Sequence, residues 1–414
     1  MAQTDFLIIG GGLAGVSAAE TLRRLLPRAT IAIVSGEIDP PHDRPPLSKE
    51  FLRGEKHRDA VLLHPIEFYQ ANRLNLLLGT PALALDAEAG SVLLADGERL
   101  GYQRLLLATG GRPKKLGVPG ETMPGVYELR TLGEAERIRD ATFGATHVVV
   151  IGAGFIGLEV AASLAVQGIE VTVLNLDDQL WPGVMPPAVA ALIQRDMEAR
   201  GVRFRHCTRV TGFEGKDTLE RILTNAGDLD ASVAVVGAGI QLNVELAAGA
   251  GLAIDDGIVV DEYLRTSASG IFAAGDVACF PDSIGGTSDR PARRHVEHWD
   301  NAIAQGKVAA ANMAGRTMAY RRVPYFWSDV FDTSINVVGY LDAADELLIR
   351  GSVEARRFSL LALRDGALRG ALLVNNARDR RAAAELVMRR TPILDHRDRL
   401  ADPSFKLAAL VPAE

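Results

Sequence analysis

The chain has 414 residues, which is too long for one ordinary domain and suggests about three. Its 48% hydrophobic and 23% charged residues are typical of a folded globular protein, and its formal net charge of -7 argues against a nucleic-acid-binding role. Since no stretch has the roughly 18 apolar residues of a membrane span, and no basic segment precedes the first apolar run, we expect a cytoplasmic protein that does not bind membranes.

The first segment has the pattern of a dinucleotide-binding strand, turn and helix. Gly10, Gly12 and Gly15 have GxGxxG spacing directly after a short apolar run. The first glycine allows a tight turn, the second lets the backbone approach a pyrophosphate, and the third lets helix and strand pack closely. The helix N-terminus would bind the phosphates, and Glu37 is placed to accept hydrogen bonds from a ribose. The predicted elements are a strand over residues 5–9, a helix over 13–26 and a strand over 30–35.

The same pattern returns in the middle of the chain. Gly152, Gly154 and Gly157 again follow an apolar run and precede a helical pattern. One such motif is a weak signal, but two copies in the correct context make coincidence unlikely, so we expect two dinucleotide-binding domains. The predicted elements here are a strand over 147–151, a helix over 156–167 and a strand over 169–174.

Two further apolar runs end in glycine turns and predict where the chain crosses between these domains. The first, 105–111, contains Thr109 and Gly110, and the second, 233–239, ends at Gly239. The second domain would then be inserted into the first. Later, residues 319–374 alternate like antiparallel strands, and a helix is expected around 382–388.

An apolar strand over 271–275 delivers Asp276 beside a glycine. Alone, this would suggest a helix-capping aspartate. Together with the first glycine turn, it resembles the two-dinucleotide-domain flavoproteins, in which this aspartate binds the ribityl chain of FAD. The resemblance implies an α/β, glutathione-reductase-like fold with two Rossmann-like domains and a C-terminal α+β domain. The domains would be FAD-binding (1–111 and 240–312), NAD-binding (112–239) and C-terminal (313–414).

The segment Pro-His-Asp-Arg-Pro-Pro-Leu-Ser-Lys at 41–49 narrows the resemblance to one family. It is similar to the oxygenase-coupled ferredoxin reductases, which include putidaredoxin, rubredoxin and biphenyl dioxygenase reductases. The similarity continues through residues 152–159, 274–277, 297–299 and 325–329, and so covers nearly the whole chain.

This resemblance implies roles for five residues. Arg44 and Arg130 match residues that contact FAD, and Trp299 matches an aromatic near the flavin and nicotinamide. Lys49 matches a lysine near the flavin N5 edge, paired with the residue that matches Glu159. A lysine there would stabilise negative charge on reduced flavin, and the glutamate would offset the cost of burying it. The alternative is that Lys49 and Glu159 are exposed charges.

Cysteine usage bears on where the electrons go. Residues 38–55, where flavin disulfide reductases carry a cysteine pair, contain none, so reduced flavin must pass electrons directly to an external acceptor. This favours a protein that accepts one electron, although it does not exclude oxygen or a quinone. Cys207 and Cys279 form no metal-ligand or disulfide pattern, and we expect both to be small packing residues.

Residues 175–183 bear on the choice between NADH and NADPH. Asn175 ends the last strand of the second unit, where the family commonly has a glutamate, and Gly183 stands where many relatives have an arginine. An amide can still bind a ribose, but it rejects a 2′-phosphate less firmly than a carboxylate. Asp177 and Asp178 follow closely, and their charge should repel a 2′-phosphate, so NADH is favoured.

We therefore predict an NADH-dependent reductase that passes electrons through FAD to a 2Fe-2S ferredoxin, which supplies a ring-hydroxylating dioxygenase or a cytochrome monooxygenase. Alternatives are a rubredoxin reductase, an NADH oxidase, and a redox-sensing assembly protein like apoptosis-inducing factor. The sequence does not distinguish a monomer from a homodimer. Small ferredoxins are generally acidic, so docking is expected at an arginine cluster, whose members are Arg378, Arg380, Arg381, Arg389 and Arg390.

Overall fold

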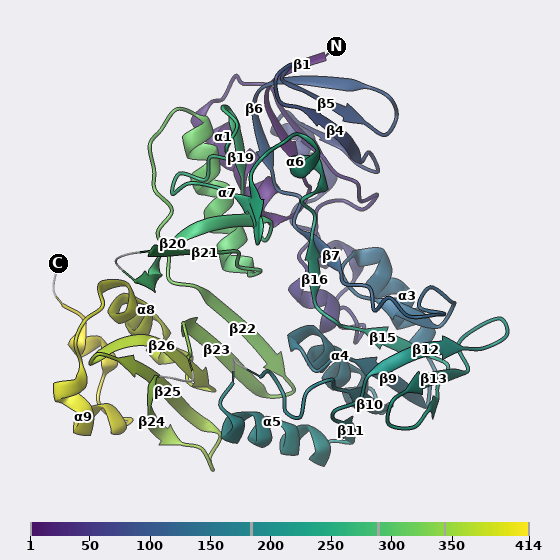
Figure 1. Cartoon of the computed structure of the whole chain (residues 1–414), viewed down its shortest axis with the longest axis vertical. Helices are drawn as coiled ribbons and strands as arrows, with labels where there is room; N and C mark the ends of the chain where they lie inside the picture. Colours follow the sequence, from purple (N-terminus) through teal and green to yellow (C-terminus); the bar gives the residue numbers. More distant parts are fainter. Residues whose placement is uncertain (1, 183–184, 288–289, 343–344, 413–414) are drawn as a thin grey trace. The chain divides into compact units, whose positions relative to one another are not determined.

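The computed structural model describes residues 2–182, 185–287, 290–342 and 345–412. The chain divides into two compact units, each built from three segments (Figure 1). The first unit comprises Met1–Asp43, Leu62–Arg112 and Gln241–Phe326, and the second comprises Arg44–Val61, Pro113–Ile240 and Trp327–Glu414. No helix among the described residues combines the length and apolarity that crossing a bilayer requires.

The first unit is built on a sheet with a parallel core. Strands β3 (Leu74–Leu77), β2 (Ile31–Val34), β1 (Ala2–Ile9) and β6 (Arg99–Leu107) lie side by side, and β19 (Ile271–Ala273) pairs with β6. Their apolar residues are buried on both faces, as expected when helices cover a parallel sheet. Helix α1 (Leu13–Leu25) packs against α7 (Trp299–Met313).

Smaller elements complete this unit. Strands β5 (Ser91–Leu94) and β4 (Ala82–Asp86) extend the sheet beyond β6 in antiparallel fashion. The others are α2 (Ile66–Ala71), α6 (Glu245–Gly249), β17 (Ile254–Asp255), β18 (Gly257–Val259), β20 (Ala278–Thr287) and β21 (Arg290–Arg294). The chain passes from one unit to the other through the short strands β7 (Gly111–Pro113) and β16 (Ile240–Leu242).

The second unit contains another parallel sheet, in the order β11 (Val202–Arg205), β10 (Glu170–Leu174), β9 (His147–Ile151), β15 (Ala234–Val236) and β8 (Val126–Glu128). Its central strand order repeats that of the first unit. Strand β9 is followed by α4 (Phe155–Val166) and then β10, just as β1 is followed by α1 and then β2. The remaining elements are α3 (Leu132–Thr142), α5 (Pro187–Ala199), β12 (Val210–Glu214), β13 (Arg221–Thr224) and β14 (Leu229–Asp230).

The C-terminal part of the second unit is a five-stranded sheet. Its order is β22 (Tyr325–Val330), β23 (Thr333–Gly339), β26 (Ala367–Val374), β25 (Arg357–Arg364) and β24 (Glu346–Ser352). Helix α8 (Arg380–Arg389) packs on β23 and β26 through its buried apolar face, and α9 (Arg397–Ala401) lies against β24. Together with the two glycine-turn units, this sheet confirms the predicted α/β fold class with a C-terminal α+β part.

Most elements predicted from local patterns are confirmed within one or two residues at their ends. Local sequence patterns did not predict α2, α3, α5, α6, α7 or α9, which the structure adds. The expectation for Cys279 is confirmed, because it is buried in β20, but the one for Cys207 is wrong. Strand β11 ends at Arg205, and Cys207 lies beyond it, exposed, with a φ of 50°.

Candidate functional site

In the first glycine turn, two of the three motif glycines have no space for a side chain and the third has open space. Gly10 has a φ of 120°, and a Cβ on it would lie 2.1 Å from the Ala108 carbonyl oxygen. A Cβ on Gly15 would lie 2.1 Å from the Gly10 oxygen, whereas one on Gly12 would meet nothing within 4 Å. Gly12 is the N-cap of α1, without a side-chain cap. The helix N-terminus is therefore accessible to an anion such as a dinucleotide pyrophosphate.

The second turn repeats this construction. Gly152 has a φ of 107°, and its Cβ would lie 2.3 Å from the Gly237 oxygen. A Cβ on Gly157 would lie 2.1 Å from the Gly152 oxygen, and one on Gly154, the N-cap of α4, would meet nothing within 4 Å. Gly239 follows β15 beside this turn with a φ of 96°. The residues present therefore fit a dinucleotide in each unit.

Glu37 lies beside the first turn. The turn approaches the end of β2 closely, since a Cβ on Gly11 would be 2.9 Å from Ser35 Oγ. The backbone N–H of Glu37 donates to the same hydroxyl (3.2 Å), and the Glu37 carboxylate lies 3.7 Å from His42 Nε2. A carboxylate at the end of this strand is suited to bind the hydroxyls of an adenosine ribose.

Thr109 and Gly110 lie at the carboxyl end of β6, next to Gly10. The Thr109 hydroxyl donates to the Asn243 carbonyl (2.8 Å), and Asn243 Nδ2 donates back to the Thr109 carbonyl (2.9 Å). Gly110 has a φ of 58°. The Thr109 hydroxyl therefore donates within the protein, and its oxygen remains able to accept from a ligand.

Asp276 also lies near the first turn. It follows β19, and the preceding Gly275 approaches Ala14 of α1, since a Cβ on Gly275 would be 3.0 Å from that of Ala14. The backbone N–H of Gly275 donates to Gln305 Oε1 of α7 (2.9 Å). The carboxyl ends of β1, β2, β6 and β19 thus bring the predicted residues of the first unit to one edge, where α/β folds bind ligands.

Trp299 begins α7 and is 37% exposed. Its indole N–H donates to Asp43 Oδ1 (2.7 Å), which fixes the ring. The preceding residue, His298, stacks on Phe326 with 4.7 Å between ring centroids, and burial lowers the pKa of His298. An indole anchored through its nitrogen presents a flat apolar face at a defined angle.

Lys49 and Glu159 form a buried ion pair in the second unit. Lys49 Nζ lies 2.7 Å from Glu159 Oε2, and the two residues are 8% and 4% exposed. The alternative in which both are exposed charges is therefore wrong. Sequence reasoning missed Ser48 and Ser328, whose hydroxyls bind the same carboxylate. Both serines lie in segments that resemble the family, 41–49 and 325–329, so the resemblance could have pointed to them.

Arg44 and Arg130 are brought together in the second unit. The Arg44 guanidinium donates to the Arg130 carbonyl oxygen. The Arg130 backbone N–H donates to Glu134 Oε2 (2.8 Å), and Thr131 caps α3 in a reciprocal capping box with Glu134. The position of both arginines therefore depends on the start of α3.

Asn175 is buried and its side chain is used inside the protein. Its Nδ2 donates to the Gln179 carbonyl oxygen (2.9 Å) and to His206 Nδ1 (3.1 Å). An amide nitrogen carries only two N–H groups, so neither remains for a ribose. His206 in turn contacts Gln194 Oε1 through Nε2 (3.0 Å).

The residues that follow Asn175 differ from it in exposure. Asp177 and Asp178 are both exposed, so their charges face solvent near the end of β10. Gly183 lies outside the described residues. Of the predicted determinants of nicotinamide choice, the two aspartates are therefore the ones with accessible side chains.

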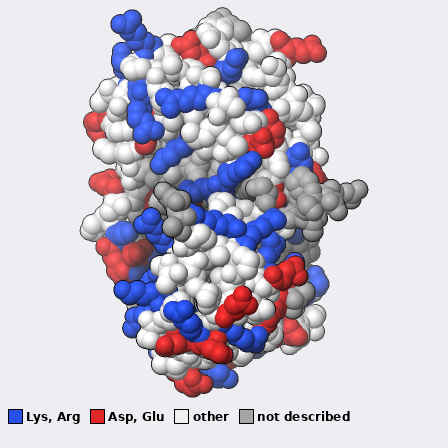
Figure 2. Space-filling view, turned by 90° about the vertical axis from the view of Figure 1, so that its left-hand side faces the viewer, with Lys and Arg blue, Asp and Glu red and all other residues white. Residues whose placement is uncertain are grey.

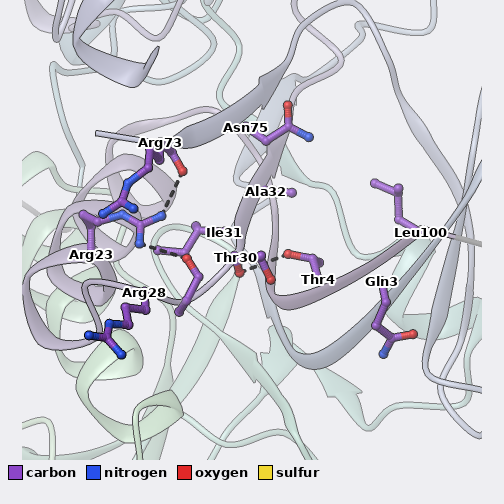
Figure 3. A pocket seen from close by; sticks show the side chains of 11 residues that line it. Gln3, Thr4, Arg23, Arg28, Thr30, Ile31, Ala32, Arg73, Asn75 and Leu100 are labelled. Carbon is purple, nitrogen blue, oxygen red and sulfur yellow. Dashed lines mark hydrogen bonds between the residues drawn. The ribbon is translucent and has the colours of Figure 1, made fainter. Parts of the chain in front are cut away.

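A hollow of about 440 Å³ lies in the first unit, away from this edge (Figure 3). It is at the amino ends of β1, β2 and β3, and Arg23, Arg28 and Arg73 line part of it. Arg23 donates to several backbone carbonyls, including those of Asn72 (2.8 Å) and Ala29 (2.8 Å). Burial and the charge of Arg73 lower its pKa. Arg23 therefore stabilises the loops that contain Asn72 and Ala29. The hollow is not at the carboxyl end of the parallel strands, where α/β folds bind ligands.

The residues of the predicted arginine cluster are exposed, and some of them bind other groups of the protein. Arg389 pairs with Glu385 (3.4 Å), and Arg378 donates to the Pro403 carbonyl. Arg380 and Arg381 lie side by side in sequence at the start of α8. Figure 2 shows one face of the molecule, over which Lys and Arg side chains are spread with smaller groups of Asp and Glu among them.

Comparisons with known proteins cover the whole chain. Residues 4–306 match the family model described as pyridine nucleotide-disulphide oxidoreductase, and residues 325–411 match the model described as reductase C-terminal. The chain is 37% identical to rhodocoxin reductase of Rhodococcus erythropolis over 98% of its length and 94% of that protein. It is 36% identical to the ferredoxin–NAD(+) reductase component of the anthranilate 1,2-dioxygenase system of Burkholderia cepacia, over 98% and 99% of the chains.

Solved structures resemble it over the same extent. The ferredoxin reductase for the CYP199A2 system of Rhodopseudomonas palustris superposes with a TM-score of 0.92 at 34% identity, covering 99% of this chain and 100% of that one. The covalent complex of putidaredoxin reductase with putidaredoxin gives a TM-score of 0.93 at 33% identity, covering 99% of each chain.

Proposed function

Because this chain belongs to the pyridine nucleotide-disulphide oxidoreductase family, we propose that it is an NADH-dependent ferredoxin reductase that carries FAD. The observation that carries this conclusion is the pair of matching glycine turns, each open at the glycine that caps a helix. Two such turns in one chain provide one place for a flavin dinucleotide and another for a nicotinamide dinucleotide.

The chain's own residues bind and orient these groups. Bound FAD supplies chemistry that no side chain here has, taking two electrons as hydride and giving them up singly. In the first unit the residues proposed to hold it are Gly10, Gly12, Gly15, Glu37, Thr109, Gly110, Asp276 and Trp299. The family resemblance adds Arg44, Lys49 and Arg130. Those proposed to hold NADH are Gly152, Gly154, Gly157, Glu159 and Gly239.

The acceptor is a ferredoxin. Because residues 38–55 contain no cysteine, electrons leave for an external protein and not for an internal disulfide. We propose a 2Fe-2S ferredoxin that supplies a dioxygenase or a cytochrome monooxygenase, since relatives are named as components of such systems. A cytoplasmic location, and a monomeric or homodimeric state, stay predictions.

A steady-state assay tests this function. The purified protein should be yellow and should reduce cytochrome c with NADH only when a 2Fe-2S ferredoxin is added. A rate that does not depend on ferredoxin but consumes oxygen would favour an NADH oxidase. A rate restored by rubredoxin instead would change the partner. Colourless protein that takes up no flavin would overturn the proposal.

Charge reversal at the start of α8 should weaken ferredoxin docking. In an Arg380→Glu, Arg381→Glu variant we expect the kcat/KM for ferredoxin to fall about tenfold at low salt, because complementary charge mainly accelerates association. Ferricyanide reduction should be unchanged. A matched control is Arg99→Glu, Arg104→Glu, which makes the same charge change at exposed positions on β6. Equal losses in both variants would count against docking at α8.

The exposed aspartates should set nicotinamide choice. Replacing Asp177 and Asp178 with arginine should strengthen binding of 2′,5′-ADP, measured by calorimetry, about tenfold, because arginine attracts a 2′-phosphate that aspartate repels. Asn175→Ala should leave the preference for NADH over NADPH unchanged, since both of its N–H groups are used internally. Asp217→Arg, an exposed change in the turn between β12 and β13, serves as the control.

A further inference from the structure

Glu159 is held by partners from two segments that are far from it in the sequence. Its Oε2 lies 2.7 Å from Lys49 Nζ and accepts from Ser48 Oγ (2.5 Å), and its Oε1 accepts from Ser328 Oγ (2.8 Å). The two serines are 1% and 0% exposed, so these hydrogen bonds form away from water. All these residues belong to the second unit.

Ser328 has a distinct place in this cluster. Among the residues that the structure describes, it alone donates to Oε1, whereas Oε2 accepts from Ser48 and pairs with Lys49. It lies on β22, where Ser328 and Val330 are buried and the intervening Asp329 is partly exposed, so the strand itself turns the hydroxyl inward. The C-terminal sheet therefore contributes one functional group to the buried ion pair.

The orientation of a glutamate carboxylate is not set by its own torsions. The terminal χ3 rotation of glutamate is broad and roughly two-fold, so hydrogen-bond donors decide which oxygen faces which partner. Fixing Oε1 on Ser328 leaves Oε2 directed at Lys49. The hydroxyls are neutral, so they stabilise the carboxylate without competing for the charge of the lysine.

Lys49 has a hydrogen-bonding group left for a ligand. An ammonium carries three N–H groups, and Lys49 pairs with Glu159 and donates to the Pro45 carbonyl (3.3 Å). The direction of the third N–H depends on how firmly the first two are held. A donor that fixes Glu159 therefore also fixes the direction in which Lys49 points.

We propose that Ser328 is a positioning residue for the redox reaction, which acts by locking the Glu159 carboxylate and, through it, the Lys49 ammonium. The proposal rests on the proposed function, in which Lys49 borders the flavin during reduction by NADH. Ser328 itself need touch neither cofactor. A purely structural role would instead affect stability alone.

Replacing Ser328 separates these two roles. In Ser328→Ala and in Ser328→Cys, whose thiol is a poor donor, we expect the rate of flavin reduction by NADH in stopped flow to fall about tenfold. The KM for NADH should stay within about twofold, because the second glycine turn, which is proposed to bind the pyrophosphate, is unchanged. Ser328→Thr keeps the hydroxyl and should recover most of the rate.

A control is available on the same sheet. Ser359 is also fully buried, on β25, and accepts from Asn376 Nδ2 (2.7 Å) without contacting Glu159. Ser359→Ala should lower the denaturation midpoint and leave the rate of flavin reduction unchanged. If Ser359→Ala slows reduction as much as Ser328→Ala does, the effect is general destabilisation and the proposal fails.

A readout without turnover completes the test. In the flavin-free protein, the effects of Ser328→Ala and Glu159→Gln on the urea midpoint should be non-additive, whereas those of Ser359→Ala and Glu159→Gln should add. If NADH reduces the flavin of the wild-type protein and of Ser328→Ala at equal rates, this inference alone is overturned. Wild-type protein that NADH does not reduce overturns the proposed function as well.

Discussion

Gly12→Ala is expected to give a folded protein that purifies with at least about tenfold less flavin, while Gly154→Ala keeps its flavin and loses affinity for NADH by a similar factor. Both glycines have extended backbone angles that alanine adopts without strain. Both would place a methyl group in open space, so folding should be undisturbed. That open space is where the second glycine of the motif lets a pyrophosphate approach.

The two variants are controls for each other. Flavin content is measured from absorbance, and nicotinamide affinity from titration of the oxidised protein with NAD(+). Gly12→Ala should lower the first quantity, and Gly154→Ala should lower the second. Gly249→Ala, a change in α6 that also meets nothing within 4 Å, should alter neither quantity. Loss of flavin from both Gly12→Ala and Gly154→Ala would show that the two turns do not serve separate dinucleotides.

Arg350→Met is expected to lower the free energy of unfolding by about 3–5 kcal/mol, the range for breaking a buried ion pair by removing one partner. Arg350 is 1% exposed and pairs with Asp379 Oδ2 at 2.9 Å. Its guanidinium also donates to the Leu400 and Pro403 carbonyls, both at 3.2 Å. Methionine would leave the Asp379 charge and the Leu400 carbonyl buried without this donor.

Urea denaturation followed by tryptophan fluorescence measures this effect. Arg397→Met is the matched control, because Arg397 pairs with Glu346 on the surface with its side chain 57% exposed. Exposed pairs contribute about 0–1 kcal/mol, so the control should be close to wild type. Similar losses in both variants would mean that burial of Arg350 does not matter to stability.

The fold class, the family and the two glycine turns could all be predicted from the amino-acid sequence. These depend on local rules: the spacing of glycines, the length of apolar runs and the change from one periodicity to another. The second unit's strand over His147–Ile151 was predicted to the residue, because its last four positions are apolar and glycine follows directly. The predicted family is confirmed by matches over nearly the whole chain.

Contacts between side chains that are far apart in the sequence could be seen only in the folded structure. Glu159 is 111 residues from Ser48 and 169 from Ser328, and no local pattern encodes such a contact. Asn175 reads as a ribose ligand from its place at a strand end, yet His206, 31 residues later, takes one of its N–H groups. Backbone conformation is set by near neighbours, whereas the partners of a buried polar group are set by whichever segments the fold packs against it.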